Sequence, residues 1–405
     1  MAHQTPLRDR LAQAEATLRH YGPIESQVEL VETFGELDFE YAALRKACVV
    51  IDQPHRGTIE IVGEDAIDFL NNMITQELKP GGSVLPALKP VRSFWLSRKG
   101  RITSDMRLTR IENGTPRLLV DLDVHAVEPT MASLNEYIIT EDVELRDATD
   151  RMHRLALHGP TGPLLLAEVG EVVEGPPPTD LTDRSATVLT IAGHEVIVER
   201  CDTAGVCGLE LTMATDAVVD VYGKLVEVGE PVEGQREDAP ASKIKLRPAG
   251  WLAYNTARIE AGEPLFNLDF GPDSLPGETG QATLSDRVSF TKGCYLGQEV
   301  VARMQNLGKP KQVLMGLKPH GENLTADDGF PRQPMGGTHV FSTADPDGDP
   351  IGIVSSSTIS PMLGGAAIAF AIVKSKLAED GAEVIVPAEG ARLTAKLRSD
   401  LSFVS

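Results

Sequence analysis

Cysteine, aromatic side chains, positive charge and long apolar runs are all scarce in this chain of 405 residues. Its four cysteines are too few and too scattered for a disulfide scaffold, so we expect a protein of the reducing cytoplasm. Lysine and arginine number 38 against 59 acidic residues, which gives a formal net charge of −21. This balance argues against general nucleic-acid binding, because such binding needs a basic surface that displaces counterions.

The sequence predicts no contact with a membrane. The longest apolar run, GGAAIAFAIV, has about half of the roughly 20 residues that a transmembrane helix needs. The first residues lack the apolar core of a signal peptide, and their leucines recur at helical spacing instead.

Two common motifs of binding sites give no support either. A phosphate-binding loop of the G-x-x-x-x-G-K-[ST] type is missing. Cys201 and Cys207 could pair on a metal, but ordinary packing is the favoured interpretation, so no metal site is predicted.

The alternation of apolar and polar residues predicts an α+β protein. RGTIEIVG indicates a strand and EDAIDFLNNMI a helix, and further strands follow around the hairpin dipeptide Asn113-Gly114. The same order recurs in outline between residues 146 and 220, which suggests two similar halves. From residue 311 onward, short β-like runs separated by turn residues predict a small antiparallel barrel.

These patterns divide the chain into four predicted parts. At roughly 100–200 residues per domain, the length allows two to four domains. We expect an N-terminal helical extension, two α+β domains of which the second carries a cysteine-containing loop, and a C-terminal β-barrel. Their limits are 1–40, 41–145, 146–310 and 311–405.

One cysteine lies in an unusual setting. In KGCYLGQEV, Cys294 follows Lys292 and stands between glycines, with Gln298 four residues further on. Positive charge nearby favours the reactive thiolate, and the glycines let a ligand approach the backbone. A half-buried structural cysteine would show the same features, and the residues alone favour that interpretation.

Three separated polar residues form a second candidate group. Asp105 begins the strand MRLTRI, Glu210 lies between two leucines, and Arg258 belongs to RIEAGEPLF. A carboxylate among apolar neighbours is costly to bury without a partner. The two parallel N–H donors of a guanidine-like edge, such as that of a pterin, suit a carboxylate. Taken singly, each acid is more typical of a solvated surface.

The cysteine segment resembles the K-G-C-Y-x-G-Q-E signature of the YgfZ family of folate-binding proteins, whose mitochondrial relatives serve iron–sulfur cluster maturation. A wider resemblance is to the glycine-cleavage T-protein, or aminomethyltransferase, superfamily. It runs from about residue 38 to the end, in family order, through these segments: EYAALRKACVVIDQPHRGTIEIVGEDAIDFLNNMITQEL, RKGRITSDMRL, GVCGLEL, RIEAGEPLF and IGIVSSSTISPMLGGAAIAFAIV.

The resemblance implies a multi-domain ring around a central folate pocket, ending in the β-barrel, with tetrahydrofolate or a one-carbon derivative as cofactor. Asp105 corresponds to the acid near the reacting folate nitrogen, Glu210 to the acid on the pterin edge, and Arg258 to an arginine of the pocket. Cys294 corresponds to the signature thiol, so Cys294 and Asp105 are the predicted catalytic residues.

Lys292 and Gln298 join Asp105, Glu210 and Arg258 as predicted folate-binding residues. Two positions depart from the transferases, because Thr203 and Arg92 stand where tyrosines are expected. These departures bear on the folate contacts and on aminomethyl transfer.

The resemblance implies a tetrahydrofolate-binding protein of iron–sulfur cluster assembly or repair, with an effect on tRNA modification. Its partners would be folate and iron–sulfur client proteins. An aminomethyltransferase using tetrahydrofolate is the alternative. A third hypothesis is a non-enzymatic module that binds tRNA or a protein through basic residues, namely Lys292, Arg303, Lys309 and Lys311.

Overall fold

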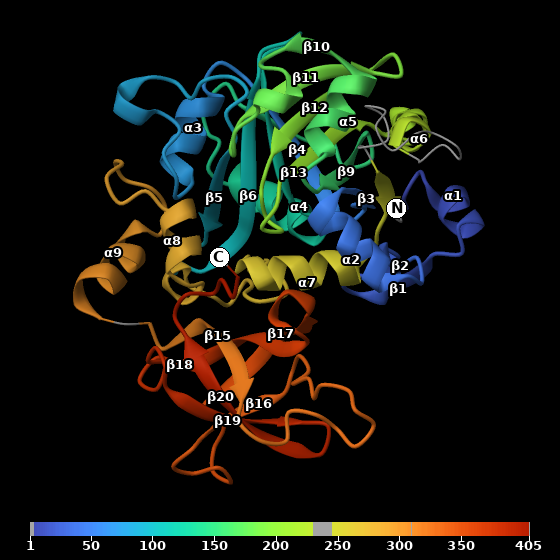
Figure 1. Cartoon of the computed structure of the whole chain (residues 1–405). Coiled ribbons are helices and arrows are strands. Elements are labelled where there is room, and N and C mark those ends of the chain that lie inside the picture. Colours follow the sequence, from blue (N-terminus) through green and yellow to red (C-terminus); the bar gives the residue numbers. More distant parts are fainter. Residues whose placement is uncertain (1–3, 230–244, 309, 405) are drawn as a thin grey trace. The chain divides into compact units, whose positions relative to one another are not determined.

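The computed structural model describes residues 4–229, 245–308 and 310–404 (Figure 1). It divides the chain into two compact units, each assembled from separated segments. Unit 1 comprises Met1–Leu70, Leu78–Arg92 and Met106–Tyr254, and unit 2 comprises Asn71–Glu77, Ser93–Asp105 and Asn255–Ser405. No helix of the described residues combines the length and apolar character that a membrane span requires.

The helices are short and lie mostly outside the strand-rich segments. Their bounds are α1 Arg8–Gln13, α2 Leu37–Lys46, α3 Ala66–Met73, α4 Val127–Asn135, α5 Gly162–Val169, α6 Val218–Gly229, α7 Trp251–Ala261, α8 Gln281–Arg287 and α9 Gln298–Leu307.

The strands before residue 250 form a hairpin and two larger sheets. Their bounds are β1 Thr17–His20, β2 Glu29–Thr33, β3 Cys48–Asp52, β4 Arg56–Val62, β5 Val91–Leu96, β6 Ile102–Ile111, β7 Arg117–Asp123, β8 Glu144–Asp147, β9 Met152–His158, β10 Gly170–Glu174, β11 Ala186–Ile191, β12 His194–Arg200, β13 Gly208–Ala214 and β14 Leu246–Pro248.

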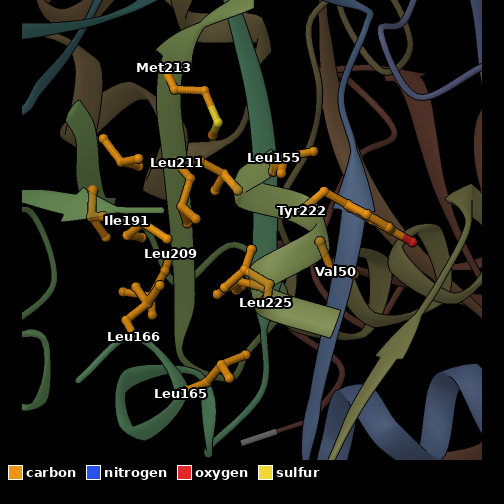
Figure 2. Packing of buried hydrophobic residues seen from close by; sticks show 14 of the residues in the cluster. Val50, Leu155, Leu165, Leu166, Ile191, Leu209, Leu211, Met213, Tyr222 and Leu225 are labelled. Carbon is orange, nitrogen blue, oxygen red and sulfur yellow. The ribbon is translucent and has the colours of Figure 1, made fainter. Parts of the chain in front are cut away.

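The seven-stranded sheet has the order β10-β11-β12-β13-β9-β3-β14. Alternate residues of its strands point to opposite faces, so one face collects the apolar side chains. There Leu209, Leu211 and Met213 of β13 pack with Leu155 of β9 and Leu225 of α6 (Figure 2). Burial of this contiguous apolar surface is the main stabilising contribution in unit 1.

The five-stranded sheet has the order β5-β6-β7-β4-β8. Within unit 1, Ile111 and Leu119 of this sheet pack against Val188 and Ile197 on the other face of the seven-stranded sheet. The turn between β6 and β7 contains the predicted Asn113-Gly114 dipeptide, and Gly114 has φ +75°, which glycine adopts without strain.

The C-terminal strands close into a barrel with the order β15-β18-β17-β16-β19-β20. Inward residues such as Leu317, Ala371 and Val386 fill it. The barrel agrees with the short β-like runs of the sequence, because their alternation places one side chain in two inside. The bounds are β15 Gln312–His320, β16 His339–Ser342, β17 Gly352–Ser360, β18 Ala366–Lys374, β19 Glu383–Ala388 and β20 Ala391–Arg398.

The first 40 residues contain more than the predicted helix. After α1, strands β1 and β2 form an antiparallel hairpin. The buried carboxylate of Glu40 in α2 then accepts hydrogen bonds from Phe34 N at 2.7 Å and Gly250 N at 2.8 Å, which tie the end of this segment to α2 and to the residue before α7 within unit 1. Helical spacing of leucines in the sequence gives no signal for this hairpin.

Candidate active site

The carboxylate of Asp105 faces a buried guanidinium within unit 2. Arg287 Nε, at the end of α8, lies 2.9 Å from Asp105 Oδ1 and 3.1 Å from Oδ2. The Arg287 side chain is 2% exposed, whereas that of Asp105 is 15% exposed. Charge-assisted hydrogen bonds from a rigid, planar group fix the orientation of this carboxylate while part of it stays accessible.

Two further acids surround the same arginine. Arg287 Nη2 donates to Glu263 Oε1 at 3.1 Å, and Nη1 donates to Asp286 Oδ2 at 3.1 Å. The guanidinium lies over the Phe94 ring, 5.9 Å from its centroid. Three carboxylates around one guanidinium give the cluster a net negative charge, which suits a cationic ligand or one rich in N–H donors.

Arg258 is deeply buried in α7, with no exposed side-chain surface. Its Nη1 donates to Asp269 Oδ2 at 2.6 Å and to the Glu263 carbonyl at 3.1 Å, and its Nη2 donates to Ser356 Oγ at 2.7 Å. These contacts join α7 to the 263–269 loop and to barrel strand β17. They give Arg258 a structural role, and its predicted role in folate binding stays a prediction.

Glu263 connects two of the predicted residues. Its carbonyl accepts from Arg258 and its carboxylate accepts from Arg287, the partner of Asp105. Asp105 and Arg258 therefore belong to one polar network inside unit 2. Glu210 lies in unit 1, in a separate network.

That network is a layer of charge buried between the two sheets of unit 1. Asp121 of β7 lies 2.9 Å from Arg56, 3.0 Å from Arg107 and 3.1 Å from Arg154. Arg107 also pairs with Glu199 of β12 at 2.7 Å. Burial on its own would raise the pKa of Asp121, but the three guanidinium groups hold it well below its usual range.

Glu210 of β13 lies on this polar face, directly opposite Glu199 on β12 and Ala156 on β9. It is 5% exposed. Burial raises the pKa of Glu210, although Arg107 acts in the opposite direction. A carboxyl group that is short of compensation in its own fold can accept hydrogen bonds from a ligand that brings N–H donors.

The ammonium group of Lys292 is bound by backbone carbonyls. Its Nζ donates to the carbonyls of Asn71, Ile74 and Gln76 at 2.5, 2.8 and 3.0 Å. All three ammonium hydrogens therefore have acceptors at the end of α3. These carbonyls hold the ammonium group, and the expectation that Lys292 favours the thiolate of Cys294 stays a prediction. Its predicted role in folate binding stays a prediction.

Cys294 is exposed, so the half-buried structural cysteine that the residues alone favoured is not found. Gln298 begins α9, and its Nε2 donates to the Gly293 carbonyl at 3.4 Å, so it helps to shape the cysteine loop. Lys292 is buried and Lys309 lies outside the described residues, which leaves the predicted basic surface with Arg303 and Lys311.

Sequence reasoning missed Arg287, Glu263 and Asp121. The signal for Arg287 was weak, because an arginine near the end of a short helix is usually a surface residue. Asp121 stood in an apolar strand, LLVDLD, and the criterion that singled out Glu210 would have found it.

Comparison with known proteins gives matches along nearly the whole chain. The GCVT N-terminal domain model matches residues 7–290, and the glycine cleavage T-protein C-terminal barrel domain model matches residues 323–404. The aminomethyltransferase of Staphylococcus carnosus (strain TM300) is 27% identical over 399 residues, which cover 97% of this chain and 96% of that protein. The aminomethyltransferase of Bacillus velezensis is 27% identical over 403 residues, which cover 98% of this chain and 97% of that protein.

A solved structure shares the fold. The glycine cleavage system aminomethyltransferase T from Bartonella henselae superposes with a TM-score of 0.80 at 21% identity, over 100% of this chain and 98% of that one. The α+β fold class with its terminal barrel is thereby confirmed. The two family models and the curated relatives confirm the resemblance at the level of the superfamily. The ring around a folate pocket and the narrower assignment to YgfZ stay predictions.

Proposed function

Because the chain belongs to the glycine cleavage T-protein family, we propose that it binds tetrahydrofolate and transfers a one-carbon unit from an aminomethyl group. The aminomethyltransferases among its relatives favour this alternative over the iron–sulfur function. Proteins of this family use tetrahydrofolate as the one-carbon carrier. The observation that carries the proposal is Asp105, a partly accessible carboxylate oriented by the buried Arg287.

The residues present fit a reduced folate. Glu210 is a buried carboxyl on a polar sheet face, and burial raises its pKa. The amino-pyrimidinone edge of a pterin offers two parallel N–H groups, which match two carboxylate oxygens. Glu210 would hold this edge. When bound, tetrahydrofolate supplies the nitrogen to which the one-carbon unit is transferred.

Asp105 would act on that nitrogen as a proton acceptor and as a source of negative charge. Such work needs a carboxylate in a fixed direction, which the two contacts with Arg287 Nε provide. The acids Glu263 and Asp286 on the same guanidinium add negative charge. An amine substrate in its cationic form would be attracted to such a cluster.

The test is formation of methylene-tetrahydrofolate and ammonia from tetrahydrofolate and an aminomethylated lipoyl carrier protein. We expect turnover by the wild-type chain and a loss of about 100-fold or more in Asp105→Asn, in line with removal of a general base. Cys294→Ala is the matched control and should keep its activity, because the thiol has no part in this reaction. Absence of wild-type turnover, or its loss in Cys294→Ala, would contradict the proposal.

A second candidate rests on the exposed thiol of Cys294 in the YgfZ-like signature. On this hypothesis the chain binds tetrahydrofolate and serves iron–sulfur client proteins, with effects on tRNA modification. Lys292 and Gln298 would hold the cysteine loop in a conformation that keeps the Cys294 thiol exposed to clients. In a strain that lacks the gene, Cys294→Ala should fail to restore iron–sulfur enzyme activities while Asp105→Asn restores them. Full restoration by Cys294→Ala would contradict this second hypothesis.

A further inference from the structure

His158 ends β9 and is fully buried on the polar face of the seven-stranded sheet. Neither of its ring nitrogens has a hydrogen-bond partner among the residues that the structure describes. Burying an imidazole with unmet hydrogen-bonding capacity costs about 1–3 kcal/mol. A chain that keeps such a group in its interior needs another reason for it, since an apolar side chain would pack there more favourably.

The strand register places this histidine beside Glu210. His158 is opposite Gly208 on β13, and Glu210 is opposite Ala156, so the two side chains are diagonal neighbours on one face. Diagonal neighbours in antiparallel strands are about 7–8 Å apart, a span that one flat heterocycle can bridge. Gly208 leaves room for the imidazole, because a β-carbon there would approach His158 Nδ1 to 2.9 Å.

The imidazole is held in place without using its nitrogens. The Tyr254 ring stacks on it at 29° with centroids 5.1 Å apart, and the Tyr254 hydroxyl donates to Thr203 Oγ1 at 3.1 Å. Burial lowers the pKa of His158 to about 4, so at neutral pH the ring has one donor nitrogen and one acceptor nitrogen.

We propose that His158 is a ligand-binding residue that, together with Glu210, recognises the amino-pyrimidinone edge of the folate. Glu210 accepts hydrogen bonds from the N–H groups of that edge. One ring nitrogen of His158 forms a hydrogen bond with another polar atom of the same edge. The inference rests on the proposed folate binding and adds a specificity-determining residue to it. The ligand class is a planar heterocycle that carries adjacent N–H donors and an acceptor.

The test is the affinity of the full-length protein for tetrahydrofolate, measured by titration calorimetry under reducing conditions. We expect His158→Leu to bind about 10-fold more weakly, as for the loss of one well-formed hydrogen bond. His158→Gln keeps a donor and an acceptor and should stay within about threefold of wild type. The control is His194→Leu, since His194 is a surface residue paired with Asp220 at 3.2 Å, and its affinity should not change.

A thermal melt without ligand separates binding from packing. His158→Leu should melt at or above the wild-type temperature, because an unsatisfied polar group has been removed. Wild-type affinity in a folded His158→Leu protein would overturn the inference and leave folate binding intact. Failure of the wild-type chain to bind tetrahydrofolate would overturn both.

Should His158→Leu fail to fold, the wild-type protein still gives an answer. With ¹⁵N-labelled histidine, addition of tetrahydrofolate should shift the ring-nitrogen resonances of His158, assigned by their absence in His158→Gln. Unchanged resonances at saturating tetrahydrofolate would overturn the inference.

Discussion

Asp121 shows how much of this fold depends on a single buried charge. One carboxylate compensates Arg56, Arg107 and Arg154, which come from three different strands. Desolvation makes such groups expensive, and their attraction offsets that cost only while the set is complete. Because these residues are far apart in the chain, no sequence pattern reveals that they share one site.

We predict that Asp121→Asn lowers the free energy of unfolding by about 3–5 kcal/mol, because it leaves buried guanidinium groups uncompensated. Urea denaturation at pH 7 measures the loss. The matched control is Asp347→Asn, which breaks an exposed pair with Arg392 and should cost less than about 1 kcal/mol. Equal effects of the two substitutions would show that the stability of unit 1 does not depend on keeping the buried charged layer complete.

The same aspartate gives a pH dependence with a definite sign. The pKa of Asp121 is lowered in the fold, so its stabilising effect is complete above the unfolded value of about 4 and is lost as the pH falls below it. Between about pH 5 and pH 3, the wild-type protein should therefore lose more stability than Asp121→Asn does. Parallel curves for the two proteins would contradict this assignment.

Arg258 illustrates why the candidate site could be predicted only in part. The sequence singled it out as a folate-binding arginine, whereas the structure gives it a buried partner, Asp269, eleven positions further on and past the turn that follows α7. Buried ion pairs and ligand-binding arginines give the same signal in a single sequence. Only the contacts of the guanidinium separate the two cases.

At the scale of elements, Lys292 fastens the cysteine loop to the segment after α3. Its ammonium group donates to three carbonyls between residues 71 and 76, all within unit 2. The loop that carries Cys294 is therefore tied to a segment more than two hundred positions earlier in the chain. This link could not be anticipated from a motif read as a continuous string.

Replacing Lys292 with Met should keep most of the buried stem and remove all three donors. We predict faster amide hydrogen exchange, by a factor of about 10 or more, in residues 71–77 and 289–297, because the carbonyls left unpaired cost about 1–3 kcal/mol. Mass spectrometry of exchanged peptides measures it.

The control for Lys292→Met is Arg303→Met, which removes an exposed pair with Glu299 on α9. Such a pair contributes about 0.3–0.5 kcal/mol, so exchange in residues 71–77 should stay unchanged. If hydrogen exchange in residues 71–77 became faster in both variants, or in neither, the hydrogen bonds of Lys292 would have no specific role in holding this segment.

The regular elements were the most predictable part of the fold. Each β-like run after residue 311 became a barrel strand, because alternation forces one face inward wherever a small sheet closes. The β1–β2 hairpin was missed: its strands are four and five residues long, and all of β1 is exposed, so it carries no apolar alternation.

At the scale of the whole molecule, neither compact unit is a continuous stretch of the chain. Unit 2 takes in 71–77 and 93–105, which supply the acceptors of Lys292, the Phe94 ring and Asp105. The four predicted linear parts stay a prediction. The predicted site residues likewise divide between units, with Glu210 in one and Asp105 and Arg258 in the other.

The net charge of −21 acts on the molecule as a whole and gives a prediction of its own. Like charges on a folded surface repel one another, and raising KCl from about 0.1 M to about 1 M shortens the Debye length from about 10 Å to about 3 Å. We therefore expect the melting temperature to rise by several degrees over this range in scanning calorimetry.

The control removes three exposed negative charges, at Glu322, Asp327 and Glu379, by replacement with the corresponding amides. That variant should melt higher at low salt and gain less from KCl, since it starts with less repulsion to screen. A melting temperature that falls with KCl would mean that favourable surface ion pairs outweigh the repulsion.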